Sequence, residues 1–289
     1  MLNQLAAGGI GLLLTVAVGS ALLARTRHAV ALTYGATALI CLALAGIALQ
    51  ALGTGGAPGV PLELRVGMPL ARTQLGFDAL SAAFAVIVNL ASAIVSVGAI
   101  GLGRHVREQQ RVLPFYPAFI AGMNLVLLAQ DAFSFLVGLE FMSLASWALV
   151  VSDDCSDSNR RAGLVYLIMA TGGALTLLLA FGVLAGPDGG YAFEQMRQAT
   201  AFAPAAIVLV LALVGAGSKA GLVPLHAWLP LAHPAAPSHV SALMSGVMTK
   251  VAVYGFIRIV FDLSGPPAWW WSIPVLLTAA ITALLGVLY

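Results

Sequence analysis

Charged side chains are scarce in this chain. Lysine and arginine number 13 and aspartate and glutamate 11 among 289 residues, so only 8% of the residues carry charge. Soluble globular domains carry about 25% charged residues. The composition therefore excludes a soluble protein. With 61% hydrophobic residues and a mean hydropathy of +1.00, the chain is predicted to be an all-α integral membrane protein.

Cysteine is also rare, with only two residues of this type. Cys41 lies in an apolar stretch and Cys155 in a polar one, so the sequence predicts neither a disulfide nor a cysteine metal site. No combination of nucleophile and base stands out, and no cofactor is expected. An independent enzyme is the least favoured reading of the sequence.

The first apolar stretch lacks the positive charges that precede the core of a signal peptide. Arg25, Arg27 and His28 follow the stretch instead. The sequence therefore predicts a retained first transmembrane helix with its N-terminus on the outer face of the cell membrane.

Long apolar runs recur along the whole chain. A membrane-spanning helix needs about 20 apolar residues. This template predicts eight full spans and a ninth that the end of the chain interrupts. They are Leu5–Ala24, Ala29–Leu52, Ala79–Leu102, Leu113–Gln130, Ala132–Val151, Gly163–Ala185, Ala205–Leu225, Ser238–Phe261 and Trp271–Tyr289.

The arginines support an orientation with the N-terminus outside. Inner loops then hold seven of them and outer loops four, as the positive-inside rule expects. The inner set is Arg25, Arg27, Arg104, Arg107, Arg111, Arg160 and Arg161, and the outer set is Arg65, Arg72, Arg197 and Arg258.

Two outer segments are long enough to hold structure of their own. Gly53–Phe77 is rich in glycine and proline and is predicted to hold a short hairpin. Tyr191–Phe202 is mildly amphipathic and is expected along the membrane surface. Asp78 is predicted to cap the third helix.

Three ionisable side chains lie inside apolar spans: Glu140, Lys219 and Lys250. Placing a charge in hydrocarbon is costly, so such residues usually face a bundle interior or a water-filled path. One acid and two lysines on three helices indicate a proton relay. The alternative is a static Glu140–Lys219 pair that only holds helices together.

Proline and glycine interrupt the seventh span close to Lys219. Pro224 removes a backbone donor, and helix is not expected to resume before Ser238 because three further prolines follow. Discontinuous helices often line ion paths in transporters. An ordinary proline kink is the alternative. The glycines around Lys219 do not have the spacing of a Walker motif, which excludes a nucleotide-binding loop.

Three histidines fall on or beside this break, and histidine relays protons near neutral pH. His226 is predicted to take part in the relay, whereas His233 is expected to be structural. His239 and Lys250 are eleven residues apart, which on a regular helix places them on one face about 16 Å apart. His239 is therefore either a relay member or a helix-start residue. A zinc site of these histidines is weakly supported.

The stretch GLEFMSLAS around Glu140 resembles the fifth-helix motif of the antiporter-like membrane subunits of respiratory complex I. GSKAGLVPLHAWLP, which contains Lys219 and His226, resembles their broken seventh helix. The following HPAAPSHVSALMSGVMTKVAVYGFIRI is most similar to the version in group 4 membrane-bound hydrogenases such as formate hydrogenlyase. The resemblance runs from about Asp78 to the end of the chain.

This resemblance implies roles for the charged residues. Glu140 would tune the proton affinity of Lys219, Lys250 would pass the proton along a central hydrated axis, and His226 would match a family histidine beside the break. It also implies partners: other membrane subunits and a peripheral iron–sulfur arm, where the redox chemistry takes place. The chain itself would be a non-catalytic proton-pumping subunit of an NADH:quinone oxidoreductase-like or hydrogenase complex.

Family members carry two inverted five-helix repeats, so the resemblance also predicts a domain organisation. Residues 1–112 would form three N-terminal helices, 113–262 one five-helix proton-channel repeat, and 263–289 the start of a truncated ninth helix. The second repeat would come from the remainder of a longer chain or from a partner. Two further functions stay open: a subunit of a multisubunit cation/proton antiporter and an inert membrane scaffold.

Overall fold

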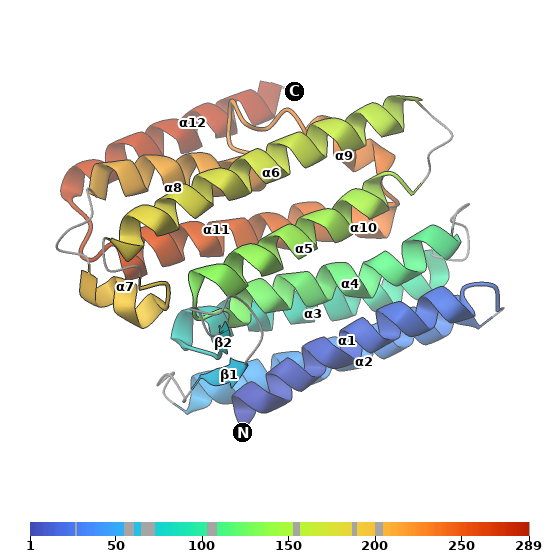
Figure 1. Cartoon of the computed structure of the whole chain (residues 1–289). Coiled ribbons are helices and arrows are strands. Elements are labelled where there is room, and N and C mark those ends of the chain that lie inside the picture. Colours follow the sequence, from blue (N-terminus) through green and yellow to red (C-terminus); the bar gives the residue numbers. More distant parts are fainter. Residues whose placement is uncertain are drawn as a thin grey trace.

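The described chain is almost entirely helical, with a single two-stranded sheet (Figure 1). The computed structural model describes residues 1–26, 28–54, 61–64, 73–102, 109–152, 157–186, 190–199 and 205–288. Several residues used in the sequence analysis lie outside this set: Arg27, Arg65, Arg72, Arg104, Arg107 and Cys155.

Six long helices form the first part of the bundle, and their axes run roughly side by side (Figure 1). Their bounds are α1 Leu2–Leu23, α2 Ala29–Gly53, α3 Ala79–Leu102, α4 Gln109–Leu128, α5 Ala132–Val150 and α6 Asp157–Ala185.

The second part of the chain contains shorter and interrupted helices. The interrupted helices α8, α9 and α10 are followed by α11 and α12. One π-helical segment precedes α11 and one follows it. Their bounds are α7 Phe193–Ala199, α8 Ala205–Ala220, α9 Leu229–Ala235, α10 Ser238–Leu243, π segment Met244–Met248, α11 Thr249–Ile257, π segment Arg258–Leu263, a 3₁₀ turn Trp269–Trp271 and α12 Ser272–Leu288.

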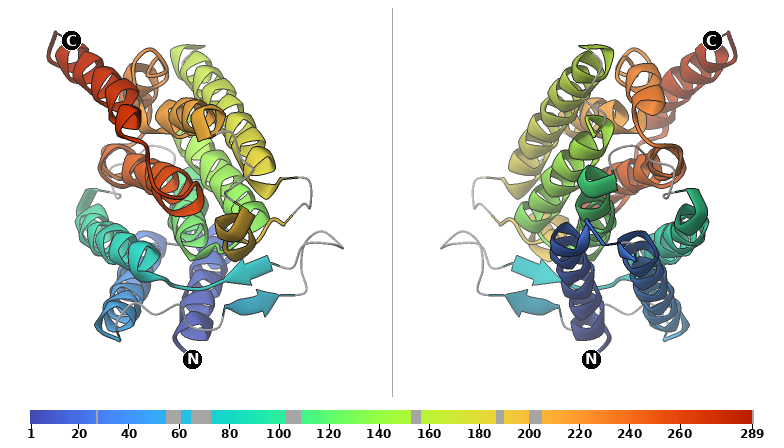
Figure 2. Two further views of the ribbon diagram at one scale, coloured as in Figure 1. Left: turned by 90° about the vertical axis from the view of Figure 1, so that its left-hand side faces the viewer. Right: turned by 90° about the vertical axis from the view of Figure 1, so that its right-hand side faces the viewer.

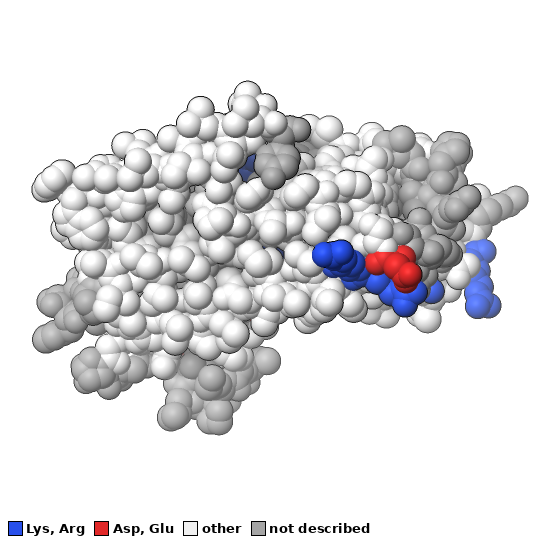
Figure 3. Space-filling model, turned by 90° about the horizontal axis from the view of Figure 1, so that it is seen from above, with Lys and Arg blue, Asp and Glu red and all other residues white. Residues whose placement is uncertain are grey.

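The predicted spans agree with the helices over most of their length. Eight helices within the described residues are long and apolar enough to cross a membrane, counting Ser238–Leu263 as one. The seventh predicted span is the exception, because α8 has only 16 residues. The chain is therefore a multi-pass, all-α membrane protein. Figure 3 agrees with this, since the face it shows is largely uncharged and its charges gather towards one end.

The two ends of the bundle differ in structure (Figure 1). One end, here called the hairpin end, carries α7 and the antiparallel strands β1 (Leu62–Leu64) and β2 (Thr73–Leu75). The predicted hairpin is therefore present, and α7 lies within the amphipathic segment that the sequence indicated. The opposite end, here called the α10 end, carries α9 and the start of α10.

A buried aspartate fixes the hairpin against the bundle. Asp131 caps α5 by accepting a hydrogen bond from the backbone N–H of Ser134 (2.7 Å). Its second carboxylate oxygen accepts one from the N–H of Gln74 on β2 (2.8 Å). One side chain thus satisfies backbone donors of both elements.

The helix break differs in two ways from the prediction. First, α8 ends at Ala220, directly after Lys219, because Gly221 takes a positive φ of 81° and the N–H of Leu222 turns back to the carbonyl of Gly217. Second, helix resumes at Leu229 and not at Ser238. Pro230 falls in the first turn of α9, where its missing N–H costs nothing.

Glycine permits close helix contacts at two places. A Cβ on Gly122 of α4 would lie 2.8 Å from the backbone of Met142 on α5, and one on Gly173 of α6 would lie 2.9 Å from the carbonyl oxygen of Gly215 on α8. Small residues of this kind allow membrane helices to pack backbone to backbone. The first contact joins α4 to α5, and the second joins α6 to α8, the helix that carries Lys219.

The last helix packs least against the rest of the chain. Figure 2 shows α12 at the periphery of the bundle, and none of its residues is buried. Its side chains are almost all apolar, as hydrocarbon or another apolar surface requires.

Candidate proton-transfer site

Lys219 lies at the end of α8, and its side chain is 3% exposed. Its ammonium donates hydrogen bonds to the hydroxyl of Ser143 on α5 (2.5 Å) and to the hydroxyl of Tyr166 on α6 (3.1 Å). It also lies 4.9 Å from the centre of the Tyr166 ring. Three helices therefore meet at one buried amine, which has hydroxyl partners that can both accept and donate protons.

A second layer of contacts holds these hydroxyls in place. Ser146 is hydrogen-bonded to Tyr166 (2.5 Å), and the hydroxyl of Ser143 donates to the carbonyl of Leu139 (2.7 Å). Trp228 packs edge-on against Tyr166 at 5.1 Å and donates its indole N–H to the carbonyl of Ser218 (2.8 Å). The loop after the break therefore closes over the lysine.

Glu140 lies one turn before Ser143 on α5, but it does not contact Lys219 directly. Its oxygen Oε1 is buried without a hydrogen-bond partner among the described residues. The carboxyl group borders a cavity of about 640 Å³ between α5 and α6, whose walls are otherwise nearly all apolar. Its charge still acts on Lys219 and Tyr166 through space. The static Glu140–Lys219 contact pair is therefore not what the structure contains.

His226 lies in the loop between α8 and α9, seven residues after Lys219, and is partly buried. Its carbonyl accepts the N–H of Leu229 and so begins α9 (2.9 Å). His233, predicted to be structural, is hydrogen-bonded through Nδ1 to Ser241 on α10 (2.6 Å) and stacks on Trp228.

Lys250 and His239 do not share a helix face, contrary to the prediction. Lys250 is exposed and donates to the carbonyl of Ser245 (3.2 Å), whereas His239 is 3% exposed and faces α2 and α4. The π segment Met244–Met248 lies between them. A π turn holds more residues than the 3.6 of an α-helix, so the alignment calculated for a regular helix is lost.

The three histidines near the break do not form a metal site. Among the residues that the structure describes, no three His, Cys, Asp or Glu side chains come together as possible metal ligands. The histidines instead have separate surroundings: His226 in the loop, His233 against Ser241 and His239 against Tyr34.

Arg258 is buried, contrary to the prediction from the sequence. The count of arginines in loops predicts it in an outer loop, but it lies in the second π segment and is 1% exposed. Its guanidinium forms ion pairs with Asp78 at the start of α3 and with Asp262 one turn away (2.6 Å). The hydroxyl of Tyr254 accepts two further hydrogen bonds. The sequence did contain one sign of this ion pair, because Arg258 and Asp262 are four residues apart and so lie on the same face of a helix.

This charge cluster joins α3, α7 and the last π segment at the hairpin end. Arg197 of α7 donates two 2.9 Å hydrogen bonds to Asp262. Asp78 also caps α3 through the N–H of Ser81 (2.8 Å), as predicted. Burial alone would raise the pKa of Asp78, but the hydrogen bonds and charge of Arg258 outweigh this effect and hold that pKa below its ordinary value. The cluster borders an open cavity of about 830 Å³.

The sequence of this chain matches a known family of membrane proteins. Residues 129–289 match the family model described as "NADH:quinone oxidoreductase/Mrp antiporter, TM". The chain belongs to this family. The matched region begins just before α5 and includes Glu140, Lys219 and Lys250.

Named relatives cover much of this chain. It is 39% identical over 240 residues to "Hydrogenase-4 component B" of Escherichia coli (strain K12), which covers 80% of this chain and 35% of that protein. It is 28% identical over 253 residues to "Formate hydrogenlyase subunit 3" of the same strain, covering 85% and 40%. The resemblance to group 4 hydrogenase subunits is therefore confirmed. The chain spans little more than a third of the length of these relatives.

Two solved structures share the fold. The membrane-bound sulfane sulfur reductase, an archaeal respiratory membrane complex, aligns with a TM-score of 0.76 at 21% identity, covering 95% of this chain and 56% of its own. The Mrp complex from Dietzia sp. DQ12-45-1b aligns with a TM-score of 0.72 at 25% identity, covering 89% and 28%. The antiporter-like fold predicted from the sequence is therefore confirmed.

Proposed function

We propose that this chain supplies a proton half-channel to a membrane-bound oxidoreductase complex of the hydrogenase or NADH:quinone type. Lys219 would be the central proton carrier. The observation that carries this proposal is its buried amine at the end of α8, bonded to hydroxyls of Ser143 and Tyr166. A buried lysine without a contacting carboxylate can release its proton more readily than one held in an ion pair.

The other ionisable residues would act around this carrier. Glu140 would change the proton affinity of Lys219 through space, since its charge acts on Lys219 without contact. His226 lies beside the break, and Lys250 is exposed on α11, where another protein surface or water could receive its proton. His239 would take part in proton transfer at the α10 end of the bundle.

The redox reaction would take place in partner subunits, including a peripheral iron–sulfur arm. The name of the relative hydrogenase-4 component B and the description of the matching family model support this assignment. The chain would then be a non-catalytic pumping subunit. We also infer that the hairpin end faces outward, because Arg25, Arg111, Arg160 and Arg161 belong to the α10 end, where the positive-inside rule expects the inner face.

The decisive experiment measures proton uptake into inverted vesicles that contain the complete complex, energised in separate runs with hydrogen and with NADH. Lys219→Ala should abolish proton uptake while the complex still assembles. Lys219→Arg is the matched control: it keeps a positive charge but cannot give up its proton. If Lys219 relays protons, the Lys219→Arg variant should also fail to take up protons. If Lys219 only holds helices together, the Lys219→Arg variant should still take up protons, and this outcome would overturn the proposal.

A second candidate function is a subunit of a multisubunit cation/proton antiporter. The Mrp complex, with its TM-score of 0.72, is the observation that favours it. Sodium would then replace redox chemistry as the coupled process. Proton movement that requires a sodium gradient, and proceeds without hydrogen or NADH, would establish this function in place of the first.

An inert scaffold makes the opposite prediction to both. All charge-removing substitutions at Glu140, Lys219 and Lys250 would then leave coupling per assembled complex unchanged, and only the amount of complex would fall. Blue-native electrophoresis beside the uptake assay separates the two quantities.

A further inference from the structure

Five polar side chains from α2, α3, α4 and α10 are buried together near the α10 end. They are 0–3% exposed, and none of them was part of the expected relay except His239. We call this group the polar seam: Ser92, Ser96, Tyr116, Tyr34 and His239.

Hydrogen bonds and ring contacts join the members across helices. The hydroxyl of Tyr34 on α2 is hydrogen-bonded to Nε2 of His239 on α10 (2.8 Å). The Tyr116 ring of α4 lies 4.8 Å from the Tyr34 ring and 5.6 Å from the His239 ring. The Tyr116 hydroxyl is hydrogen-bonded to Ser96 on α3 (2.9 Å), whose hydroxyl reaches the carbonyl of Ser92 (2.6 Å).

Two members of the seam have polar atoms that are still unsatisfied. The hydroxyl of Ser92 and Nδ1 of His239 are buried and have no hydrogen-bond partner among the described residues. A buried polar atom without a partner is unfavourable, and ordered water usually satisfies it. Hydrogen bonds join Tyr34 to His239 and Tyr116 to Ser96, and ring contacts alone join these two pairs. Water at the two open atoms would add hydrogen bonds at the Ser92 side and at the His239 side of the seam.

Other buried hydroxyls in the same helices bond differently. Thr37 on α2 donates to the carbonyl of Thr33 in its own helix (2.7 Å), and Ser20 on α1 does the same with Ala17 (2.8 Å). Local bonds of this kind join no helices. The seam differs because Ser96 also meets the hydroxyl of Tyr116 on α4, and Tyr34 meets the imidazole of His239 on α10.

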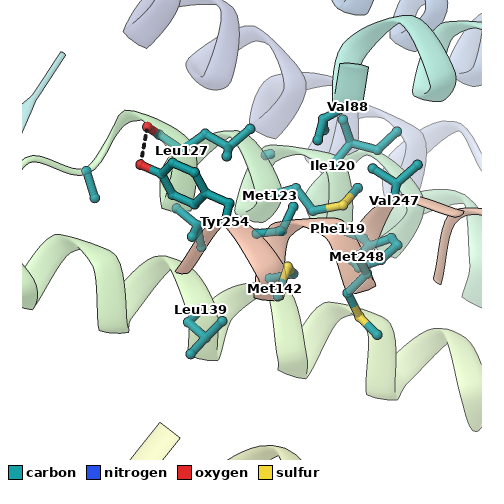
Figure 4. Close-up of a cluster of buried hydrophobic side chains, with 14 of the residues drawn as sticks. Val88, Phe119, Ile120, Met123, Leu127, Leu139, Met142, Val247, Met248 and Tyr254 are labelled. Carbon is teal, nitrogen blue, oxygen red and sulfur yellow. Dashed lines mark hydrogen bonds between the residues drawn. The ribbon is translucent and has the colours of Figure 1, made fainter. Parts of the chain in front are cut away.

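The apolar packing keeps the seam separate from Lys219. Figure 4 shows side chains of α4, α5 and the first π segment packed into one apolar cluster, which includes Met123, Met142 and Met248. Ser143 and Lys219 lie on the α5–α8 side, whereas Ser96 and Tyr34 lie on the α2–α3 side. His239 is therefore reached from α2, α3 and α4 without passing Lys219.

We propose that helices α2, α3 and α4 form a proton-exchange branch, which loads His239 through Tyr34. Water would stand at the two open positions and between the hydroxyls of Tyr116 and Tyr34, so that Tyr34 regains the proton that it gives to His239. This proposal rests on the proposed proton-transfer function. The imidazole accepts a proton at one ring nitrogen and releases one from the other, so it returns to its neutral form after each transfer. Each hydroxyl likewise gives one proton and takes one. Helices α2, α3 and α4 are thus part of the proton path and do not only pack against the rest of the bundle.

Proton uptake by the complete complex in inverted vesicles tests the branch. Tyr34→Phe removes the bond to His239, and Ser92→Val fills the space beside the open hydroxyl with a methyl group. Both should lower uptake per assembled complex severalfold. Thr37→Val is the matched control on α2 and should leave uptake unchanged, because its hydroxyl bonds only within its helix. Unchanged uptake in both seam variants would overturn the branch.

Cysteine labelling gives an independent measurement of water in the seam. In a Cys41→Ala, Cys155→Ala background, Ser92→Cys should react with methanethiosulfonate ethylammonium several times faster than Val88→Cys, which is also fully buried on α3 but in the apolar cluster. Intact mass reads the modification. Equal rates would mean that the seam is dry and only joins helices.

The two proposals fail in distinguishable ways. If Lys219→Ala still pumps, the proposed function fails whatever the seam does. If Lys219→Ala stops uptake while Tyr34→Phe and Ser92→Val pump normally, the function stands and the branch is wrong. A loss of assembled complex without a loss of uptake per complex would also assign the seam a purely structural role.

Discussion

The amine of Lys219 on α8 and the hydroxyl of Ser143 on α5 are joined by a 2.5 Å hydrogen bond. Lys219 is the last residue but one of α8, and Ser143 lies in the second half of α5. The serine also donates to its own helix at Leu139. The charged amine therefore lies against a hydroxyl and not against a carboxylate, and the predictions for Tyr166 and Glu140 follow from this contact.

Tyr166→Phe should weaken proton transfer without disturbing the fold. The substitution keeps the ring that Trp228 packs against but removes the hydroxyl shared by Lys219 and Ser146. A hydrogen bond to a charged group contributes about 2 kcal/mol, so proton uptake should fall well beyond assay error. Uptake per complex in inverted vesicles measures the effect. Normal uptake would show that Ser143 alone suffices.

Glu140→Gln should lower proton uptake and shift its dependence on pH. The carboxyl group acts on Lys219 only through its charge, because the structure has no contact between the two side chains. The amide keeps the shape and removes that charge. Uptake recorded between pH 6 and pH 8 checks this prediction. A profile that coincides with the wild type would exclude an electrostatic role.

Asp78→Asn should destabilise the hairpin end by about 3 kcal/mol, since it leaves the buried Arg258 with one carboxylate partner fewer. Thermal unfolding in detergent measures the loss. Asp157→Asn is the control, because its ion pair with Arg160 is exposed and should contribute little. If both variants unfold alike, the cluster does not stabilise this end.

The same cluster predicts a dependence of stability on acid. The pKa of Asp78 in the folded protein lies below its ordinary value, so this carboxylate stabilises the fold above the unfolded pKa of about 3.9. That stabilisation is lost as the pH falls through the lower folded pKa. Unfolding temperatures at pH 7 and in strong acid should therefore differ less in Asp78→Asn than in the wild type.

Gly173→Leu should disrupt the contact between α6 and α8 and cost about 2 kcal/mol. Its Cβ would lie 2.9 Å from the carbonyl oxygen of Gly215. Gly172→Leu is a matched control, since nothing lies within 4 Å of a Cβ there. The yield of folded protein after detergent extraction compares the two. Equal yields would contradict the packing described for Lys219.

The fold was largely predictable because membrane helices leave a strong apolar signal. The range Ala79–Leu102 agrees with α3 at both ends, and the hairpin after Gly53 and the cap at Asp78 are present. The break near Lys219 was also expected. Its position was not, because the turn at Gly221 ends α8 before Pro224 can act.

Contacts between distant residues account for most of what the sequence did not reveal. Tyr34 and His239 are 205 residues apart, and Asp78 and Arg258 are 180 apart. Counting arginines in loops could not detect that Arg258 is buried. Tyr166 sits in an apolar helix, where a tyrosine gives no sign of its partners. The alignment of His239 with Lys250 failed because a π turn has no pattern in the sequence.

The helix that carries Lys250 has a π segment at each end, Met244–Met248 before α11 and Arg258–Leu263 after it. Each wide turn contains surplus residues that an ordinary α turn would not need. The direction in which Lys250 points therefore depends on these two wide turns and not on the α-helical repeat alone.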